Sequence, residues 1–335
     1  MTTRRARIAA LGGGNGLSTV LRGLKGEAVD LTAIVTVADD GGSSGRLRRE
    51  LGVLPPGDIR NCLVALADDE SLLGQLFQHR FADGDLAGHS FGNLFLAALT
   101  EVTGSFDMAV HESSQVLKVN GRVLPSTLEQ VRLWAERADG TTVCGETQIG
   151  SGQGACRRVW LDPPPDAHPR TIDAILDADV VLIGPGSLFT SVLPHLAVRD
   201  IVDAMQETRA LRVYVGNVMT QSGETNGFDA AEHLRHVCLA LDGSVDVAVV
   251  HEGPLDPVAL ARYALQGQEP VHADETALQA FGVTVVRGDL AAKGQVVRHS
   301  PTALARVVMQ LVENPPARRE EIGTTRHLQP TPPSA

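Results

Sequence analysis

The feature that most constrains this chain is a pair of glycine-rich segments, each of which directly follows a short apolar run. The apolar run 7–11 stops at Gly12–Gly16, and the run 30–37 stops before Asp39, Asp40 and the glycine- and serine-rich segment 41–45. A strand that ends in a glycine turn and continues as a helix offers backbone N–H groups to an anion. Open parallel sheets bind ligands beyond the carboxyl ends of their strands, so two such turns predict one shared site for a phosphorylated ligand.

The rest of the chain is typical of an α/β protein with a mostly parallel sheet. Aromatic residues make up only 4% of the chain, so its core is expected to consist of the aliphatic residues that fill sheets covered on both faces. We expect one α/β domain over 1–312. A small β-rich insert is predicted at about 108–161, from short alternating runs at 115–119, 141–144 and 157–161. The segment 313–335 is rich in Pro, Thr, Arg and Glu and is predicted to be a disordered tail.

Charge and hydropathy narrow the classes of partner. The formal net charge is −11, which argues against nucleic acid or an anionic membrane as the main partner. No window approaches the roughly 18 uninterrupted apolar residues of a membrane span. The four cysteines are far apart and form no C-x-x-C pair, which favours reduced thiols and a cytoplasmic protein.

Neither glycine-rich segment matches a known phosphate-binding fingerprint. Leu17 stands where the third glycine of a dinucleotide fingerprint would be, and no Gly-Lys-Ser/Thr follows. A tight strand-to-helix turn without a ligand therefore remains an alternative for the first segment. In the second segment, Asp39 and Asp40 could hold Mg²⁺ beside a phosphate, or one of them could cap the next helix. The residues leave metal and no metal equally open.

Two further helix starts carry polar residues. Asp58 follows Pro55-Pro56-Gly57 and is expected to cap a helix over 59–67, which would leave Arg60 and Asn61 in its first turn. A cation there opposes the helix dipole, and an anion between them would relieve the conflict. His89, Ser90 and Asn93 repeat this pattern at another helix start, although a lone histidine there is more often an ordinary polar residue.

The second half of the chain adds two more polar strand ends. Gly184, Pro185, Gly186 and Ser187 follow the apolar run 179–183, and Gly216-Asn217 follows the run 211–215. Four polar or glycine-rich strand ends are hard to explain as turns alone. A nucleotide or nucleotide-sugar site accounts for all four.

Five of these motifs, taken in order, resemble the YvcK family of gluconeogenesis factors, which is called CuvA in actinobacteria. They are Gly-Gly-Gly-Asn-Gly at 12–16, Ala-Asp-Asp-Gly-Gly-Ser-Ser-Gly at 38–45, Pro-Pro-Gly-Asp-Ile-Arg-Asn at 55–61, His-Ser-Phe-Gly-Asn at 89–93 and Gly-Pro-Gly-Ser at 184–187. The resemblance covers roughly residues 6–312. This family lies within the wider CofD-like group, whose enzyme member is 2-phospho-L-lactate transferase.

The resemblance implies a Rossmann-like doubly wound core, a cytoplasmic homodimer and binding of UDP-sugars such as UDP-N-acetylglucosamine. It also implies a role in cell shape and wall synthesis during growth on gluconeogenic carbon sources, with cell-wall synthesis proteins as partners and without a tightly bound cofactor. It suggests Tyr263 and Arg298 as UDP-sugar contacts, against ordinary surface packing as the alternative. The complete set of expected ligand-binding residues is Gly12, Gly13, Gly14, Asn15, Gly16, Asp40, Gly41, Gly42, Ser43, Ser44, Arg60, Asn61, His89, Asn93, Gly184, Gly186, Ser187, Asn217, Tyr263 and Arg298.

The polar residues at the strand ends and the family resemblance favour different conclusions about catalysis. Polar strand ends with paired carboxylates would suit a CofD-like Mg²⁺-dependent phosphotransferase that uses a nucleotide diphosphate donor. The YvcK branch carries no firmly assigned reaction, so the resemblance favours a non-catalytic regulator. No catalytic residue is assigned from the sequence.

Overall fold

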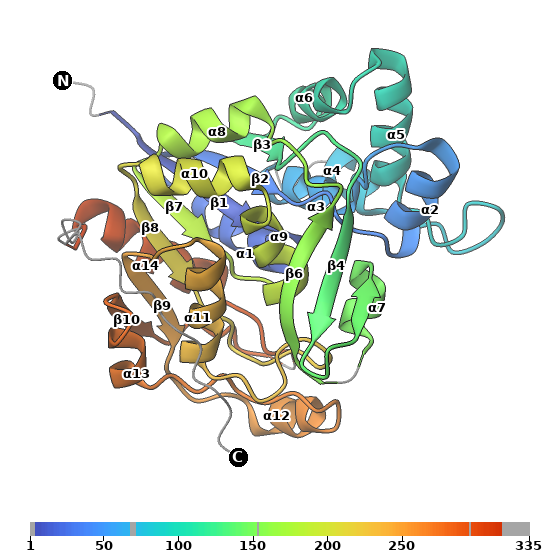
Figure 1. The fold of residues 1–335 in the computed structure, drawn as a ribbon. Helices are drawn as coiled ribbons and strands as arrows, with labels where there is room; N and C mark the ends of the chain where they lie inside the picture. Colours follow the sequence, from blue (N-terminus) through green and yellow to red (C-terminus); the bar gives the residue numbers. More distant parts are fainter. Residues whose placement is uncertain (1–3, 68–71, 153, 295, 317–335) are drawn as a thin grey trace.

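A seven-stranded parallel sheet forms the centre of the molecule (Figure 1). The structure, a computed structural model, describes residues 4–67, 72–152, 154–294 and 296–316. The predicted tail lies outside the described residues from 317 onward. The sheet has the strand order β10-β9-β8-β7-β1-β2-β3. Its strands are β1 (Ala6–Gly12), β2 (Val29–Val35), β3 (Arg122–Pro125), β7 (Val180–Ile183), β8 (Leu211–Val215), β9 (Val247–His251) and β10 (Thr284–Gly288).

The strand order reverses beside β1. The chain first builds β2 and β3 on one side of β1, and then returns to place β7, β8, β9 and β10 on the other side. The chain therefore leaves the adjacent ends of β1 and β7 toward opposite faces of the sheet, into α1 and η1, and open α/β sheets bind ligands at such a point. The predicted α/β fold with a doubly wound parallel sheet is confirmed.

Helices cover both faces of the sheet. Side chains alternate along β1, so Ile8 and Ala10 enter one apolar cluster while Ala9 and Leu11 enter the other. One cluster lies under α1, α3 and α14, and the other lies under η1 and α8–α11. The helices are α1 (Gly14–Leu24), α2 (Gly42–Leu51), α3 (Gly57–Leu66), α4 (Leu72–Gln78), α5 (Phe91–Thr103), α6 (Phe106–Val116), α7 (Glu146–Gly150), α8 (Pro169–Leu176), η1 (Leu188–Val192), α9 (Leu193–Leu196), α10 (Arg199–Glu207), α11 (Ala230–Ala240), α12 (Pro257–Ala264), α13 (Glu275–Gln279) and α14 (Pro301–Glu313).

Side-chain caps set the starts of several helices. Ser90 accepts a hydrogen bond from the backbone of Asn93 at the start of α5, and Asp256 accepts two at the start of α12. Ser300 caps α14 in the same way. Within the described residues, no helix is both long enough and apolar enough to cross a membrane.

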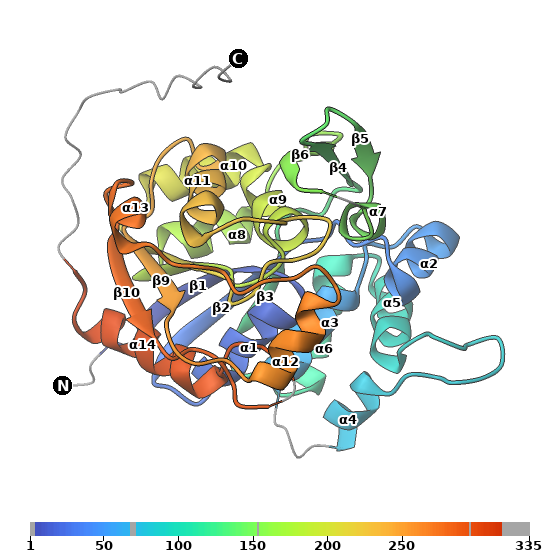
Figure 2. The ribbon, with the colours of Figure 1, turned by 90° about the horizontal axis from the view of Figure 1, so that it is seen from below.

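A small antiparallel sheet stands apart from the main one (Figure 2). It consists of β4 (Arg132–Arg137), β5 (Thr142–Cys144) and β6 (Cys156–Asp162), in the order β5-β4-β6, and α7 follows β5. The buried side chains of Leu133, Ala135 and Leu161 join the second apolar cluster. The predicted strands at 141–144 and 157–161 are confirmed.

The predicted β-rich insert began too early. Gln115 lies in α6, and β3 pairs with β2 in the main sheet, so the antiparallel part occupies 132–162 rather than about 108–161. The prediction of a strand at 115–119 was wrong because alternation over five residues also fits the end of an amphipathic helix.

Replacing Gly23 tests the packing of α1 on α14. A Cβ atom at Gly23 would lie 2.2 Å from the Pro301 carbonyl oxygen, so we expect Gly23→Ala to lower the free energy of unfolding by about 1–2 kcal/mol despite the better helix propensity of alanine. Gly26→Ala is the control, because nothing lies within 4 Å of a Cβ there. Urea denaturation of both variants measures the difference, and equal stabilities would contradict this packing.

Candidate functional site

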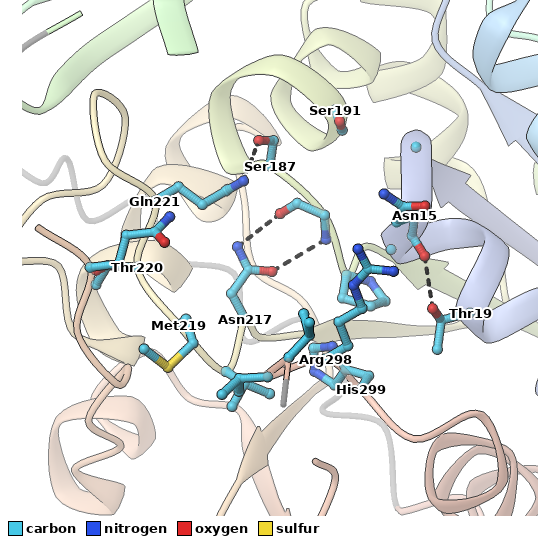
Figure 3. A pocket seen from close by; sticks show the side chains of 18 of the residues that line it. Asn15, Thr19, Ser187, Ser191, Asn217, Met219, Thr220, Gln221, Arg298 and His299 are labelled. Carbon is cyan, nitrogen blue, oxygen red and sulfur yellow. Dashed lines mark hydrogen bonds between the residues drawn. The ribbon is translucent and has the colours of Figure 1, made fainter. Parts of the chain in front are cut away.

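A cavity of about 580 Å³ opens at the carboxyl ends of β1, β7 and β8, on the strand-order reversal (Figure 3). Helix α12 and the segment 296–299 complete its wall. The lining residues are Gly13, Gly14, Asn15, Gly16, Thr19, Glu146, Pro185, Gly186, Ser187, Ser191, Asn217, Val218, Met219, Thr220, Gln221, Arg262, Tyr263, Gln266, Gln268, Val296, Val297, Arg298 and His299.

The loops after β1 and β7 are in backbone contact. A Cβ atom at Gly16 would lie 2.2 Å from the Pro185 carbonyl oxygen, so only glycine permits this approach. Gly14 has φ +54°, a conformation that other residues adopt rarely. The glycines of the first loop thus bring the start of α1 directly against the β7 loop.

Asn217 fixes the position of the β7 loop. Its side-chain oxygen accepts the Gly186 N–H at 3.2 Å, and its amide nitrogen donates to the Gly186 carbonyl at 2.8 Å (Figure 3). One side chain therefore satisfies both backbone groups of Gly186 and ties the ends of β7 and β8 together. The Gly186 N–H is consequently already occupied by Asn217, whereas the sequence had suggested that this loop would offer its N–H groups to a ligand.

The buried side chain of Glu224 fixes the position of Ser187, which lines the cavity. Glu224 accepts a hydrogen bond from Ser187 Oγ at 2.9 Å and one from the Phe189 N–H at 3.2 Å. Gln221 donates to Ser187 Oγ at 2.6 Å. Burial raises the pKa of Glu224. Ser187 is thereby held in place by two side chains.

Arg298 supplies a cation to the cavity. Its side chain extends from beside His299 toward Asn15 in Figure 3. Within the part of the chain that the structure describes, its guanidinium makes no hydrogen bond or ion pair. The Tyr263 hydroxyl donates to the Val297 carbonyl at 3.3 Å, which ties α12 to the segment that carries Arg298.

His299 is a structural residue of the same segment. Its Nε2 lies 3.1 Å from the Gly216 carbonyl oxygen, and burial lowers its pKa to about 4. The imidazole is neutral at neutral pH and adds no charge to the cavity.

Asp58 occupies part of the expected anion site at the start of α1. Its carboxylate accepts a hydrogen bond from the Gly14 N–H, and a Cβ atom at Gly13 would lie 2.5 Å from Asp58 Oδ2. The prediction that Asp58 caps its own helix was wrong: Pro56 is the N-cap of α3, and Asp58 lies in the first turn. Burial, opposed by this hydrogen bond, raises the pKa of Asp58 to about 6.

Further carboxylates surround Asp58. Burial, reinforced by Asp39 and Asp58, raises the pKa of Glu146 to about 9, so this cavity-lining side chain is protonated at neutral pH. Asp39 accepts the Gly41 N–H at 2.8 Å, whereas Asp40 accepts the backbone and hydroxyl of Thr147 at 3.0 and 3.1 Å. The two neighbouring carboxylates are thus engaged separately. Among the described residues, no three His, Cys, Asp or Glu side chains are placed to hold a metal ion.

The cavity brings together nine of the residues that the sequence proposed. They are Gly13, Gly14, Asn15, Gly16, Gly186, Ser187, Asn217, Tyr263 and Arg298. Gly12 is the last residue of β1 and Gly184 directly follows β7, and neither is in this lining. Tyr263 and Arg298 lie 76 and 111 residues after Ser187, the end of the last glycine motif, and yet line the same cavity as the motifs at 12–16 and 184–187.

The remaining proposed residues lie outside this lining. Asp40 borders a different cavity, between α2 and the antiparallel sheet, and Gly41 and Gly42 are at the start of α2. Ser43 and Ser44 are buried in α2: Ser43 Oγ lies 3.0 Å from His89 Nδ1, and Ser44 Oγ accepts the Gly57 N–H.

Arg60, Asn61 and Asn93 are also absent from the lining. Arg60 is buried and donates to the Asn61 side chain at 2.6 Å, and a Cβ atom at Gly92 would lie 2.8 Å from its aliphatic stem. The Asn93 N–H donates to Ser90 Oγ, and the Asn93 side-chain oxygen is buried without a hydrogen-bond partner among the described residues. Ligand binding by Arg60, Asn61, Asn93, His89 and the second glycine-rich segment, 41–45, stays a prediction.

Sequence reasoning missed several cavity residues. Thr220 and Gln221 stand a few positions after β8, and their place in a polar strand end could have identified them. Glu146 and Arg262 had no such signal, because Glu146 lies in the antiparallel insert and Arg262 lies in an ordinary amphipathic helix. Only the folded chain brings them to the cavity.

The raised pKa of Glu146 predicts a pH-dependent stability. Between its ordinary value of 4.5 and about 9, the unfolded chain loses the Glu146 proton while the folded chain keeps it, so this group makes stability fall as pH rises. We expect Glu146→Gln to flatten that fall. Urea denaturation at several pH values from 5 to 9 measures it, with Glu136→Gln, on the neighbouring strand β4, as the control. An unchanged slope in Glu146→Gln would contradict the burial of a proton at this site.

Comparison with known proteins places the chain in a family. Residues 8–291 match the family model described as 2-phospho-L-lactate transferase CofD. A Nostoc relative is 51% identical over 92% of this chain and 69% of its own length. The gluconeogenesis factor of Bacillus subtilis is 47% identical, covering 92% of this chain and 99% of the relative. A crystal structure of a UPF0052 family member from Bacillus halodurans matches with a TM-score of 0.89 and 46% identity, over 92% of this chain and all of that one. The chain belongs to the CofD-like family of gluconeogenesis factors.

Proposed function

We propose that the cavity binds a UDP-sugar of the UDP-N-acetylglucosamine type and that the protein acts as a regulator rather than an enzyme. The observation that carries the proposal is the position of Arg298, an unpaired cation among the described residues, in the same cavity as the start of α1. A helix N-terminus and a guanidinium are both favourable partners for a diphosphate. The cavity volume of about 580 Å³ is within the range of small-ligand sites.

The distribution of polar groups suggests how the ligand would lie. Asn15 and Gly16 belong to the first turn of α1, whose N–H groups lack partners within the helix, and they would receive the diphosphate together with Arg298. Tyr263 lines the cavity, and we place the uracil ring beside its aromatic ring. Thr220 and Gln221, on the β8 side, have the hydroxyl and amide groups that would bind sugar hydroxyls.

This binding would make the protein a cytoplasmic sensor of cell-wall precursor supply. Family membership supports a role in growth on gluconeogenic carbon sources, because close relatives are named gluconeogenesis factors. We extend this to the control of cell shape and peptidoglycan synthesis, through a homodimer that contacts cell-wall synthesis proteins. The ligand would exchange freely, without a tightly bound cofactor.

A second function, phosphoryl transfer from a nucleotide diphosphate donor, is favoured by one observation. The family model that matches residues 8–291 is described as a transferase, and Asp39, Asp58 and Glu146 interact electrostatically beside the cavity. Mg²⁺ held by Asp39 and Asp40 would neutralise the phosphates of the donor. The separate hydrogen bonds of these two carboxylates would first have to break.

Removing the Arg298 guanidinium tests the UDP-sugar proposal. We expect Arg298→Ala to weaken binding of UDP-N-acetylglucosamine at least about tenfold, because a charge-assisted hydrogen bond to phosphate is lost. Arg306→Ala removes the same charge from α14 outside the cavity and should bind like the wild type. Calorimetric titration measures both affinities. Failure of the folded wild-type protein to bind the ligand at millimolar concentration would exclude the proposal.

Nucleotide turnover separates the regulator from the enzyme. We expect the wild type, with Mg²⁺ and candidate acceptors, to leave UDP-sugars and guanosine nucleotides unconsumed over hours, as followed by phosphorus NMR. Asp39→Asn should then change affinity only, since one repulsive charge near the phosphates is removed. Release of UMP or GMP by the wild type that Asp39→Asn abolishes would instead establish the phosphotransferase.

A further inference from the structure

A second cavity, of about 640 Å³, lies between α2 and the antiparallel sheet. It is separate from the proposed nucleotide pocket, with which it shares no lining residue. The two cavities adjoin at the start of α7, where Gly145 lines the second cavity and Glu146 lines the first. The second cavity is lined by Ala38, Asp40, Gly45, Arg48, Arg49, Gln130, Arg132, Leu133, Cys144, Gly145, Asp162 and Pro163.

Three arginines from two distant parts of the chain meet around this cavity. Arg48 and Arg49 come from the last turn of α2, and Arg132 begins β4. Arg48 donates a hydrogen bond from one guanidinium nitrogen to the Val131 carbonyl oxygen. The guanidiniums of Arg49 and Arg132 make no hydrogen bond or ion pair with the described residues. Two forks of N–H donors are therefore available to a ligand.

The local charge balance favours an anion. Burial lowers the pKa of Arg48, the Asp40 carboxylate opposes that shift, and the like charge of Arg132 adds to it. Asp40 is shared with Thr147, which donates two hydrogen bonds to the same carboxylate oxygen. Three guanidiniums and two carboxylates, those of Asp40 and Asp162, line the cavity in a protein whose overall charge is −11, and Asp39, which also attracts Arg48, lies outside the lining. The positive excess is thus local to this cavity.

We propose that this arginine-lined cavity binds a small metabolite that carries a phosphate or carboxylate group. Guanidinium forks match both oxyanions in geometry and charge. The volume exceeds that of a lone inorganic ion, and Ala38, Leu133 and Pro163 provide apolar wall for the rest of the molecule. The inference does not depend on the UDP-sugar proposal, because none of these residues lines the first cavity.

Two simple probes test the site and distinguish the oxyanions. Calorimetry on the full chain would titrate inorganic pyrophosphate and, separately, citrate. Both titrations use the Arg298→Ala variant, so that the first cavity contributes no guanidinium from that position. We expect one of the two probes to bind at millimolar concentration or below. If only pyrophosphate gives a heat of binding, the ligand carries a phosphate group. If only citrate gives one, the ligand carries a carboxylate group.

Variants in the same background locate the binding. Arg132→Ala and Arg49→Ala should each weaken it about tenfold, as expected for one lost charge-assisted contact. Arg132→Lys should retain part of the affinity. Arg157→Ala is the matched control, since Arg157 carries the same charge on the same small sheet but lies outside the cavity, exposed beside Glu136.

Three results would overturn the proposal. The first is that neither probe binds, and the second is that Arg132→Ala and Arg49→Ala bind as tightly as Arg157→Ala. The third is an equal loss of affinity in all three variants, which would indicate general charge attraction. Thermal unfolding confirms that each variant is folded, and Arg49, exposed on α2, keeps the test valid if Arg132→Ala is unstable.

Discussion

The close approach of Gly16 to the Pro185 carbonyl is the constraint on which the rest of the site depends. A side chain on Gly16 would overlap that oxygen, so the first loop can lie against the β7 loop only with glycine at this position. Asn217 then holds Gly186 from the β8 side. Three strand ends are thereby locked together where the strand order reverses, and the cavity forms at that point. Preorganised backbone of this kind lowers the entropic cost of binding a ligand.

The two sides of the cavity carry different ionisable groups, a guanidinium on one and carboxyl groups on the other. Arg298 adds positive charge on the side of α12, whereas Asp58 and Glu146 are half-buried near the start of α1 and have raised pKa values. A protonated Glu146 can donate a hydrogen bond to a phosphate instead of repelling it. At neutral pH Glu146 is therefore protonated, whereas Asp58, with a pKa of about 6, is mostly ionised and is stabilised by the Gly14 N–H.

The fold was largely predictable from the sequence, and the site only in part. Apolar runs ending in glycine, such as 7–11 before Gly12, specify parallel strands and their ligand-binding edge, because side-chain periodicity and turn chemistry are local properties. The carboxylate of Asp58 was misassigned because its partner, Gly14, lies 44 positions earlier in the chain. Glu146 reached the cavity through the antiparallel sheet, and no local pattern encodes that packing. Tyr263 and Arg298 came from family resemblance alone, and the structure places both in the cavity.

A crystal structure of the protein with UDP-N-acetylglucosamine tests the central claim most directly. The account predicts density for the diphosphate between the first turn of α1 and the Arg298 guanidinium, with the uracil ring beside Tyr263. Density for the ligand elsewhere, for example beside Ser43 and His89 or in the arginine-lined cavity between α2 and the antiparallel sheet, with the strand-end cavity left empty, would contradict it.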